Sequence, residues 1–193
     1  ATRAARTQEM KEIADFAKLL EVDVVGIHVG FVPHDREDPA FASVVEALRA
    51  ACDHAASNGQ AVHLETGQEP ADVLLGFLQT VDRENLFINF DPANMILYGC
   101  GEPIEALQTV GSYVRSVHCK DAKWSDQPGV TWGEETALGE GDVDFRVFLQ
   151  TLDDLGYEGP LTIEREIPQD PERQKAEIAA ACDLLNSLKK EFP

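Results

Sequence analysis

Four polar residues stand at or near the ends of four successive apolar runs, and their side chains are of the types that bind divalent metals. Each run is short and rich in β-branched or aromatic residues, as in a buried strand, and a loop signal follows it. A carboxylate inside a strand is costly to bury unless it is paired or metal-bound. We interpret the four as ligands of one ion, with a network of buried ion pairs as the alternative. They are Glu65, Asp91, His118 and Glu164.

Carboxylate and imidazole groups together suit several ions, and the residue types do not choose among Mn²⁺, Mg²⁺, Co²⁺ and Zn²⁺. A metal held there would polarise a carbonyl or hydroxyl oxygen of a substrate. No glycine-rich phosphate loop follows any of the apolar runs, which argues against a dinucleotide site. The sequence therefore indicates a small-molecule enzyme with one divalent metal cofactor.

The elements that must position these residues alternate along the chain as a helix followed by five repeats of strand, loop and helix. That alternation predicts an α/β fold with a parallel sheet, right-handed crossovers and polar sites at the carboxyl ends of the strands. Residues 91–94 are expected to form a loop. The expected strands are 22–29, 61–65, 86–91, 114–120 and 161–164. The expected helices are 3–20, 39–57, 70–80, 103–111, 145–155 and 171–190.

Other polar residues near the strand ends are candidates for substrate binding. His28 ends the first expected strand, where it contacts substrate or merely closes the strand. Lys120 lies on the metal-binding face of its strand and binds an anionic substrate group or pairs with Glu166. Asn94 is within reach of a substrate hydroxyl, although Asn also favours turns. His63 is interpreted as an interior, hydrogen-bonded histidine rather than a ligand.

The connection 121–142 is the longest in the chain, and loops of such length are usually functional or disordered. It contains both tryptophans, Trp124 and Trp132. They either form an apolar lid over a sugar or pack the loop against the protein. We predict that Trp124 contacts the substrate.

The composition limits the partners and the location. The 193 residues suffice for one domain, taken as 1–193, and the formal charge of −19 opposes a nucleic-acid partner. Neither a membrane span nor a signal peptide is visible, so we expect a cytoplasmic protein. An upstream targeting segment stays open because residue 1 is not Met. The cysteines lack CxxC spacing and are predicted to be buried free thiols. They are Cys52, Cys100, Cys119 and Cys182.

Several short motifs carry a resemblance to a known family, and their order along the chain adds to it. The motifs are residues 26–30 (GIHVG), 64–67 (LETG), 90–94 (FDPAN), 117–121 (VHCKD), 138–141 (LGEG) and 156–159 (GYEG), the last leading to Ile163 and Glu164. With them the chain resembles the sugar phosphate isomerase/epimerase family, which has the xylose isomerase-like TIM barrel. The resemblance covers nearly the whole chain and is not specific to one substrate.

The resemblance implies an enzyme of carbohydrate metabolism that acts on a sugar, sugar phosphate, keto-sugar or polyol. In that family the matching Glu, Asp, His and Glu bind one divalent metal, manganese among the options. In the epimerases the two glutamates, here Glu65 and Glu164, also form the acid/base pair. One removes a proton beside the carbonyl and the other returns it, through a metal-stabilised enediolate. The implied activity is that of a metal-dependent isomerase or epimerase.

Two departures bear on this interpretation. A complete barrel needs about 250 residues, whereas the five expected strands correspond to strands four to eight, with the N-terminal strands missing. We therefore expect either a truncated, inactive chain or a partial barrel that a second copy completes in a homo-oligomer. Some epimerases also have His at the place of Asn94, which weakens the hydroxyl-binding role there.

Other classes compete with the isomerase. Dehydratases of the same superfamily, of the inosose or dehydroshikimate type, reuse the metal and the bases and are distinguished by loss of water. An apurinic endonuclease would need three zincs with additional His and Asp ligands. Asn94 and residues 133–135 (GEE) stand in such places, and the acidic charge disfavours DNA. A barrel that binds metal or sugar without turnover is the non-enzymatic alternative.

Overall fold

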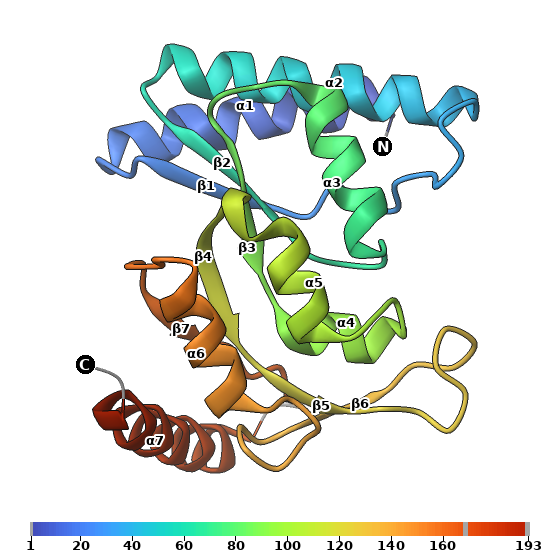
Figure 1. The fold of residues 1–193 in the computed structure, drawn as a ribbon. Helices are drawn as coiled ribbons and strands as arrows, with labels where there is room; N and C mark the ends of the chain where they lie inside the picture. The colour runs from blue at the N-terminus through green and yellow to red at the C-terminus, as the bar shows by residue number, and fades with distance from the viewer. Residues whose placement is uncertain (1, 168–169, 192–193) are drawn as a thin grey trace.

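The computed structural model describes residues 2–167 and 170–191. Its centre is a five-stranded parallel sheet in the order β1-β2-β3-β4-β7. Each strand therefore lies beside its predecessor in this sheet, which is the order of a barrel wall (Figure 1). The strands are β1 (Val24–Ile27), β2 (Ala61–Glu65), β3 (Leu86–Phe90), β4 (Val114–Cys119) and β7 (Leu161–Ile163).

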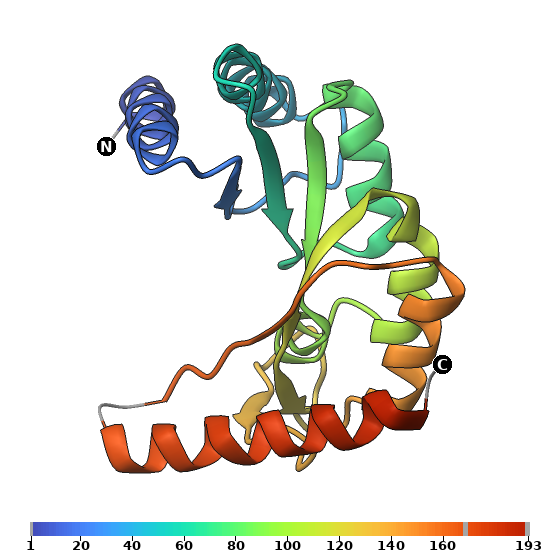
Figure 2. The same cartoon turned by 90° about the vertical axis from the view of Figure 1, so that its left-hand side faces the viewer.

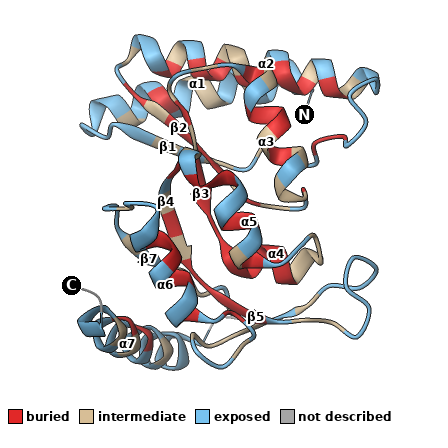
Figure 3. Cartoon of the chain, viewed as in Figure 1, coloured by how far each residue is buried: buried red, intermediate tan, exposed pale blue. Residues whose placement is uncertain are grey.

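Helices fill the connections between these strands and lie along the outer side of the curved sheet (Figure 2). The residues coloured as buried in Figure 3 lie in the strands and along the helices that pack on them. The parallel sheet with outer helices is an incomplete TIM barrel, as predicted. The main helices are α1 (Arg3–Leu19), α2 (Pro39–Ser57), α3 (Ala71–Val81), α5 (Pro103–Val110), α6 (Phe145–Asp154) and α7 (Pro171–Leu188). Two single 3₁₀ turns lie at Gly111–Tyr113 and Lys189–Glu191.

Local sequence signals set the ends of α2. The Asp38 carboxylate accepts the N–H of Ala40 at 2.7 Å, and Pro39 occupies the first helical position, where its missing N–H costs nothing. The helix closes at Asn58, and Gly59 follows with φ 78°, a conformation that glycine adopts without strain. The predicted bounds 39–57 are confirmed.

Two short elements contradict the predicted loops. Residues 91–94 are not a loop, because α4 (Pro92–Tyr98) begins there and the Asp91 carboxylate caps it through the N–H groups of Ala93 and Asn94. The connection 121–142 contains an antiparallel hairpin of β5 (Asp121–Lys123) and β6 (Glu134–Thr136). The first strand is also shorter than the predicted range 22–29.

A single buried carboxylate organises the long connection. Asp121 is 1% exposed and accepts backbone N–H groups from Ala122, Gly139, Gly141 and Val143. A side chain at Gly141 would collide with that carboxylate, so glycine is required there by close approach. The connection is therefore folded back onto the end of β4 rather than extended.

Apolar side chains of α1 are exposed at the β1 edge of the sheet. Within the described residues β1 pairs with β2 alone, and Ile13 and Phe16 are 50% and 62% exposed. Cys52 and Cys119 are buried free thiols as predicted, and Cys100 is partly buried. The prediction is wrong for Cys182, which is exposed because α7 buries its other side through Ala181 and Leu185. None of the helices in the described ranges combines the length and apolarity that crossing a membrane requires.

Candidate metal centre

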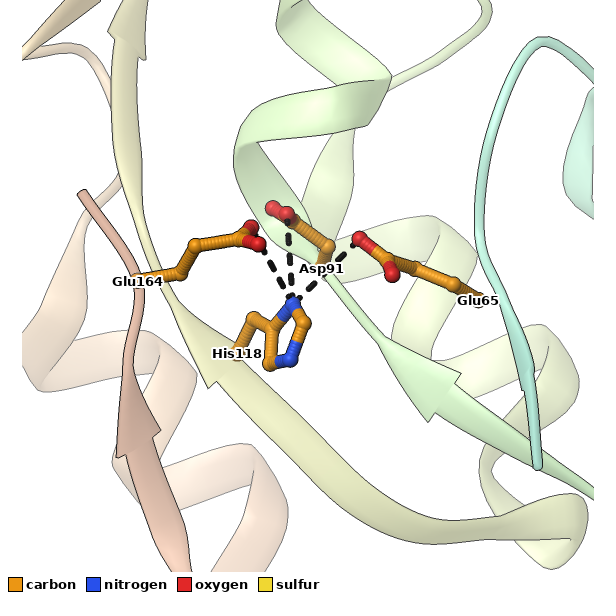
Figure 4. Close-up of side chains that lie close together, drawn as sticks. All are labelled: Glu65, Asp91, His118 and Glu164. Carbon is orange, nitrogen blue, oxygen red and sulfur yellow. Dashed lines mark ion pairs between the residues drawn. The ribbon is translucent and has the colours of Figure 1, made fainter. Parts of the chain in front are cut away.

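The carboxyl ends of the parallel strands bring the four predicted metal ligands together. Glu65 is the last residue of β2, Asp91 follows β3, His118 lies in β4, and Glu164 follows β7. One candidate ligand atom from each lies within 4.8 Å of all the others. Figure 4 shows the three carboxylates converging on the same imidazole nitrogen. Parallel strands end on one rim, so residues far apart in the sequence meet there.

The distances describe a tight cluster around His118. Its Nδ1 lies 3.3 Å from Oε1 of Glu65, 3.2 Å from Oε2 of Glu164 and 3.9 Å from Oδ2 of Asp91. The Asp91 side chain has no exposure, and that of Glu164 is the most open at 29%. The centre is thus closed on the Asp91 side and accessible beside Glu164.

The carboxylates and the imidazole shift one another's pKa values. Burial alone would lower the pKa of His118, but Glu164 and Glu65 raise it to about 10. Burial alone would raise the pKa of Glu65, but contacts from His118 and His28 lower it to about 2. Burial raises the pKa of Asp91 to about 7 despite the attraction of Lys120. In the metal-free chain a proton on His118 therefore provides the positive charge of the cluster.

Two buried polar atoms that lack a hydrogen bond indicate whether these residues could bind a metal. Asp91 Oδ2 and His118 Nδ1 are buried side-chain atoms without a hydrogen-bond partner among the described residues. Such atoms are rare in proteins because each loses its hydration without compensation. Both face the other carboxylates of the cluster. Three carboxylates and one imidazole nitrogen around a common point are a donor set that a divalent cation would satisfy.

The other nitrogen of His118 contacts a buried amide. Its Nε2 lies 3.1 Å from Nδ2 of Asn89, a residue of β3 that is 8% exposed. His118 can offer a lone pair at Nδ1 only if Nε2 carries the proton. Nε2–H then donates a hydrogen bond to Asn89 when the amide oxygen is turned toward the ring. Sequence analysis missed Asn89. The signal was present, because strand alternation places it on the same face as Asp91.

Lys120 is a buried cation beside the cluster. Its Nζ lies 3.1 Å from Oε2 of Glu164, 2.7 Å from Oε2 of Glu166 and 4.0 Å from Oδ2 of Asp91, and its side chain is 3% exposed. Burial would lower the pKa of Lys120, but Asp91 and then Glu166 and Glu164 raise it above its ordinary value. Of the two alternatives for Lys120, the structure contains the ion pair with Glu166.

Two predicted substrate-binding residues both contact Glu65. His28 places Nε2 at 3.2 Å from Oε2 of Glu65, and its own side chain is 56% exposed. Asn94 lies in α4 and donates to Oε1 of Glu65 at 3.2 Å and to the carbonyl of Thr66 at 3.0 Å. His28 is the more accessible of the two, and the substrate roles of both stay predictions.

The remaining predicted histidine and tryptophan residues are not among the four residues of the cluster. His63 is 6% exposed and lies 2.8 Å from the Ser116 hydroxyl, as expected of an interior histidine. Trp124 is partly buried and packs against the core, which is the packed-loop alternative. Trp132 is 72% exposed and lies edge-to-face on Tyr98, with ring centroids 5.2 Å apart.

Comparison with known proteins decides the family. The family of xylose isomerase-like TIM barrels matches residues 1–188. The chain belongs to this family. A xylose isomerase domain protein from Planctomyces limnophilus has a crystal structure that is 55% identical, with a TM-score of 0.96, and the match covers 99% of this chain and 68% of that one.

Relatives with named activities are more distant. An inosose dehydratase from Clostridium perfringens is 30% identical over 120 residues, which are 56% of this chain and 39% of the dehydratase. A D-psicose 3-epimerase from Clostridium cellulolyticum H10 shares the fold with a TM-score of 0.75 at 19% identity, covering 96% of this chain and 71% of the epimerase. The chain spans less than two thirds of the length of the curated relatives that it matches. Inosose dehydratases are thus among the sequence relatives of this chain, and a sugar epimerase shares its fold.

Proposed function

We propose that the chain carries the metal centre of a divalent-metal-dependent isomerase or epimerase of a sugar, sugar phosphate or keto-sugar. The proposed ligands are Glu65, Asp91, His118 and Glu164. The observation that carries the proposal is the convergence of three carboxylates on one imidazole nitrogen, with two of the facing atoms otherwise unpartnered. A metal bound there would supply a Lewis acid for a substrate carbonyl or hydroxyl oxygen.

Glu65 and Glu164 are the proposed acid/base pair because they approach the centre from different strand ends. They follow β2 and β7 and lie at 3.3 Å and 3.2 Å from Nδ1 of His118. The pKa of Glu164 is lowered, first of all by its contact with His118, and that of Glu65 is about 2. Both carboxylates are therefore ionised in the metal-free chain, which is the state that a general base requires.

The proposed reaction removes a proton from one face of a carbon atom and adds another proton at a different face or at the neighbouring carbon. One carboxylate takes the proton from the carbon beside the carbonyl, and the electrons of the broken C–H bond form the double bond of an enediolate. The other carboxylate takes up a proton from solvent and delivers it to the opposite face, which gives the epimer. Delivery to the neighbouring carbon instead, with the hydroxyl proton passing to the other oxygen, moves the carbonyl and gives the isomer. Neither outcome needs an oxidant or a second substrate.

Deuterium exchange tests this function. The chain is loaded with Mn²⁺ and incubated in D₂O with a panel of ketoses, their phosphates and inososes, and solvent deuterium beside the carbonyl is measured by NMR and mass spectrometry. The variants Glu65→Gln and Glu164→Gln should each exchange about 10²- to 10⁴-fold more slowly, the usual contribution of a general base. Glu158→Gln, at an exposed turn, is the matched control and should exchange like the wild type.

Metal binding is measured separately by Mn²⁺ electron paramagnetic resonance (EPR), because a partial barrel could bind the ion without turnover. A chain that binds Mn²⁺ but exchanges no substrate proton would leave the metal centre in place and refute the isomerase activity of this chain. A chain that binds no Mn²⁺ would refute the proposal altogether.

A dehydratase is the second candidate, favoured by the 30% identity with the inosose dehydratase. It would begin with the same proton removal, after which the substrate loses hydroxide from the next carbon. Product masses from the exchange experiment separate the two, because a dehydratase product lacks one water whereas an epimer keeps the substrate mass.

A further inference from the structure

A chain of ion pairs runs from the metal centre outward to α7. Arg165 directly follows Glu164, and its side chain contacts the β5–β6 hairpin and α7. The Arg165 side chain is 6% exposed and donates from Nη1 to Oε1 of Glu135 at 2.7 Å and from Nε to Oε2 of Glu177 at 2.6 Å. Glu135 belongs to β6 and Glu177 to α7. The guanidinium therefore joins the hairpin and the last helix at the point where β7 ends.

Glu135 contacts the two residues that follow Glu164 and also lies near Lys120. Its Oε1 accepts from Arg165 and also from the backbone N–H of Glu166, at 2.8 Å. Its Oε2 lies 3.9 Å from Nζ of Lys120, which itself donates to Glu164 at 3.1 Å. With a side chain only 14% exposed, Glu135 is a largely buried carboxylate fully engaged with cationic and backbone donors.

Glu164 needs such support because it lies beyond the end of its strand. The ladder between β4 and β7 ends at the pair Cys119 and Ile163, and the N–H of Glu164 donates to the Cys119 carbonyl at 3.2 Å. After that bond, side-chain contacts hold the segment among the described residues. Glu135 binds both Arg165 and the N–H of Glu166, Arg165 also pairs with Glu177, and Glu166 also pairs with Lys120.

We propose that Glu135 and Arg165 are positioning residues that hold Glu164 in place for metal binding. This inference rests on the proposed function, since it takes Glu164 as a ligand. Neither residue touches the candidate ligand atoms, so both act through the backbone of 164–166 and through Lys120. Outer residues that orient metal ligands commonly control metal affinity about 10- to 100-fold.

The alternative is that Glu135 and Arg165 only stabilise the packing of the hairpin and α7 against the sheet. In that case breaking it lowers stability but leaves the affinity of the folded chain for metal unchanged. Removing one partner of a buried ion pair is destabilising in either case, because the other charge is left unpaired. Stability alone therefore does not distinguish the two roles, whereas the dissociation constant of the metal does.

The test is Mn²⁺ binding by the purified chain, followed by EPR of the free ion, with circular dichroism to confirm the fold. Glu135→Gln keeps the shape and removes the charge, and we expect its Mn²⁺ dissociation constant to rise about 10- to 100-fold. Glu134→Gln is the matched control, since Glu134 is the exposed neighbour on the same strand, and its constant should equal that of the wild type. Arg165→Lys keeps the charge but loses the planar fork that joins two carboxylates, so it should weaken binding as well.

Each result has one meaning. A folded Glu135→Gln variant with wild-type affinity overturns the positioning role. If that variant does not fold, a folded Arg165→Lys variant with wild-type affinity overturns it instead. Tight binding by the wild type and the Glu134→Gln control, with weak binding by the other two, supports it. Absence of Mn²⁺ binding by the wild type overturns the proposed function and this inference with it, which separates that failure from the failure of the inference alone.

Discussion

Raising the pH should strengthen metal binding, because the metal and a proton compete for the same nitrogen. In the metal-free chain Glu164 and Glu65 lie 3.2 and 3.3 Å from Nδ1 of His118 and raise its pKa to about 10. His118 is therefore protonated at neutral pH. A metal needs the lone pair of Nδ1, so binding must expel that proton.

The size of the effect follows from the pKa values. Below pH 10 each pH unit should raise the apparent association constant about tenfold, equivalent to about 1.4 kcal/mol. Near pH 7 the dependence should be steeper, because burial raises the pKa of Asp91 to about 7 and that carboxyl must ionise too. Since His118 and Asp91 interact, the slope counts protons of the pair and not of either residue alone.

Isothermal titration calorimetry provides the assay. Mn²⁺ is titrated into the chain at one pH in buffers of different ionisation enthalpy, and the dependence of the measured heat on the buffer gives the number of protons released. At pH 8 we expect about one proton, rising toward two as the pH falls below 7. In the variant His118→Gln the number should fall toward zero at pH 8. Tight binding by the wild type without proton release would refute the assignment of Nδ1 as a ligand.

Three further predictions concern the surroundings of the centre. Asn89→Leu removes the partner of His118 Nε2 and should weaken Mn²⁺ binding about 10- to 100-fold by EPR. Asp121→Asn disturbs a carboxylate that accepts four backbone N–H groups and should lower the free energy of unfolding in urea by about 2–4 kcal/mol, whereas Asp126→Asn in the same connection should not. The pKa of Glu65 is depressed from 4.5 to about 2, so its stabilisation is present above pH 4.5 and lost as the pH falls toward 2. The pKa of His118 is raised from 6.5 to about 10, so its stabilisation is complete below pH 6.5 and lost as the pH rises through 10. Urea unfolding of the metal-free chain should therefore show its largest contribution from this pair between pH 4.5 and 6.5, and Glu65→Gln should flatten the acid side.

The meeting of the four candidate ligands could be predicted from the sequence because one rule of topology suffices. Strands that alternate with helices run parallel, and their carboxyl ends share a rim. Glu65, Asp91 and Glu164 each end or follow such a strand, so they had to approach one another once the sheet formed. The bounds of α2 were equally accessible, since Asp38-Pro39 and Asn58-Gly59 are local signals.

Some features were not predicted from the sequence, either because a local signal was given another interpretation or because the feature depends on distant partners. Helix α4 was missed although Asp91-Pro92 is the same cap signal as Asp38-Pro39, because the stretch was assigned to a loop that presents a ligand. The hairpin was missed because its strands have three residues each and no alternation, and the carboxylate of Asp121 folds the connection from a distance. Glu135 had no local signature at all, since its partners lie about 30 residues further along the chain.

The charge balance explains why these residues suit a dication better than a network of ion pairs. Glu65, Asp91 and Glu164 bring three negative charges to one point, and buried Lys120 offsets about one of them. Glu166 shares Lys120, but its side chain is 71% exposed, so water screens that charge. About two negative charges remain, and in the metal-free chain protons must offset them: one on His118, and part of another on Asp91, whose pKa of about 7 leaves it half protonated at that pH. A divalent ion supplies the same two charges without either proton. A network of ion pairs that served stability alone should give hydrogen bonds to Nδ1 of His118 and Oδ2 of Asp91, and neither atom has one among the described residues.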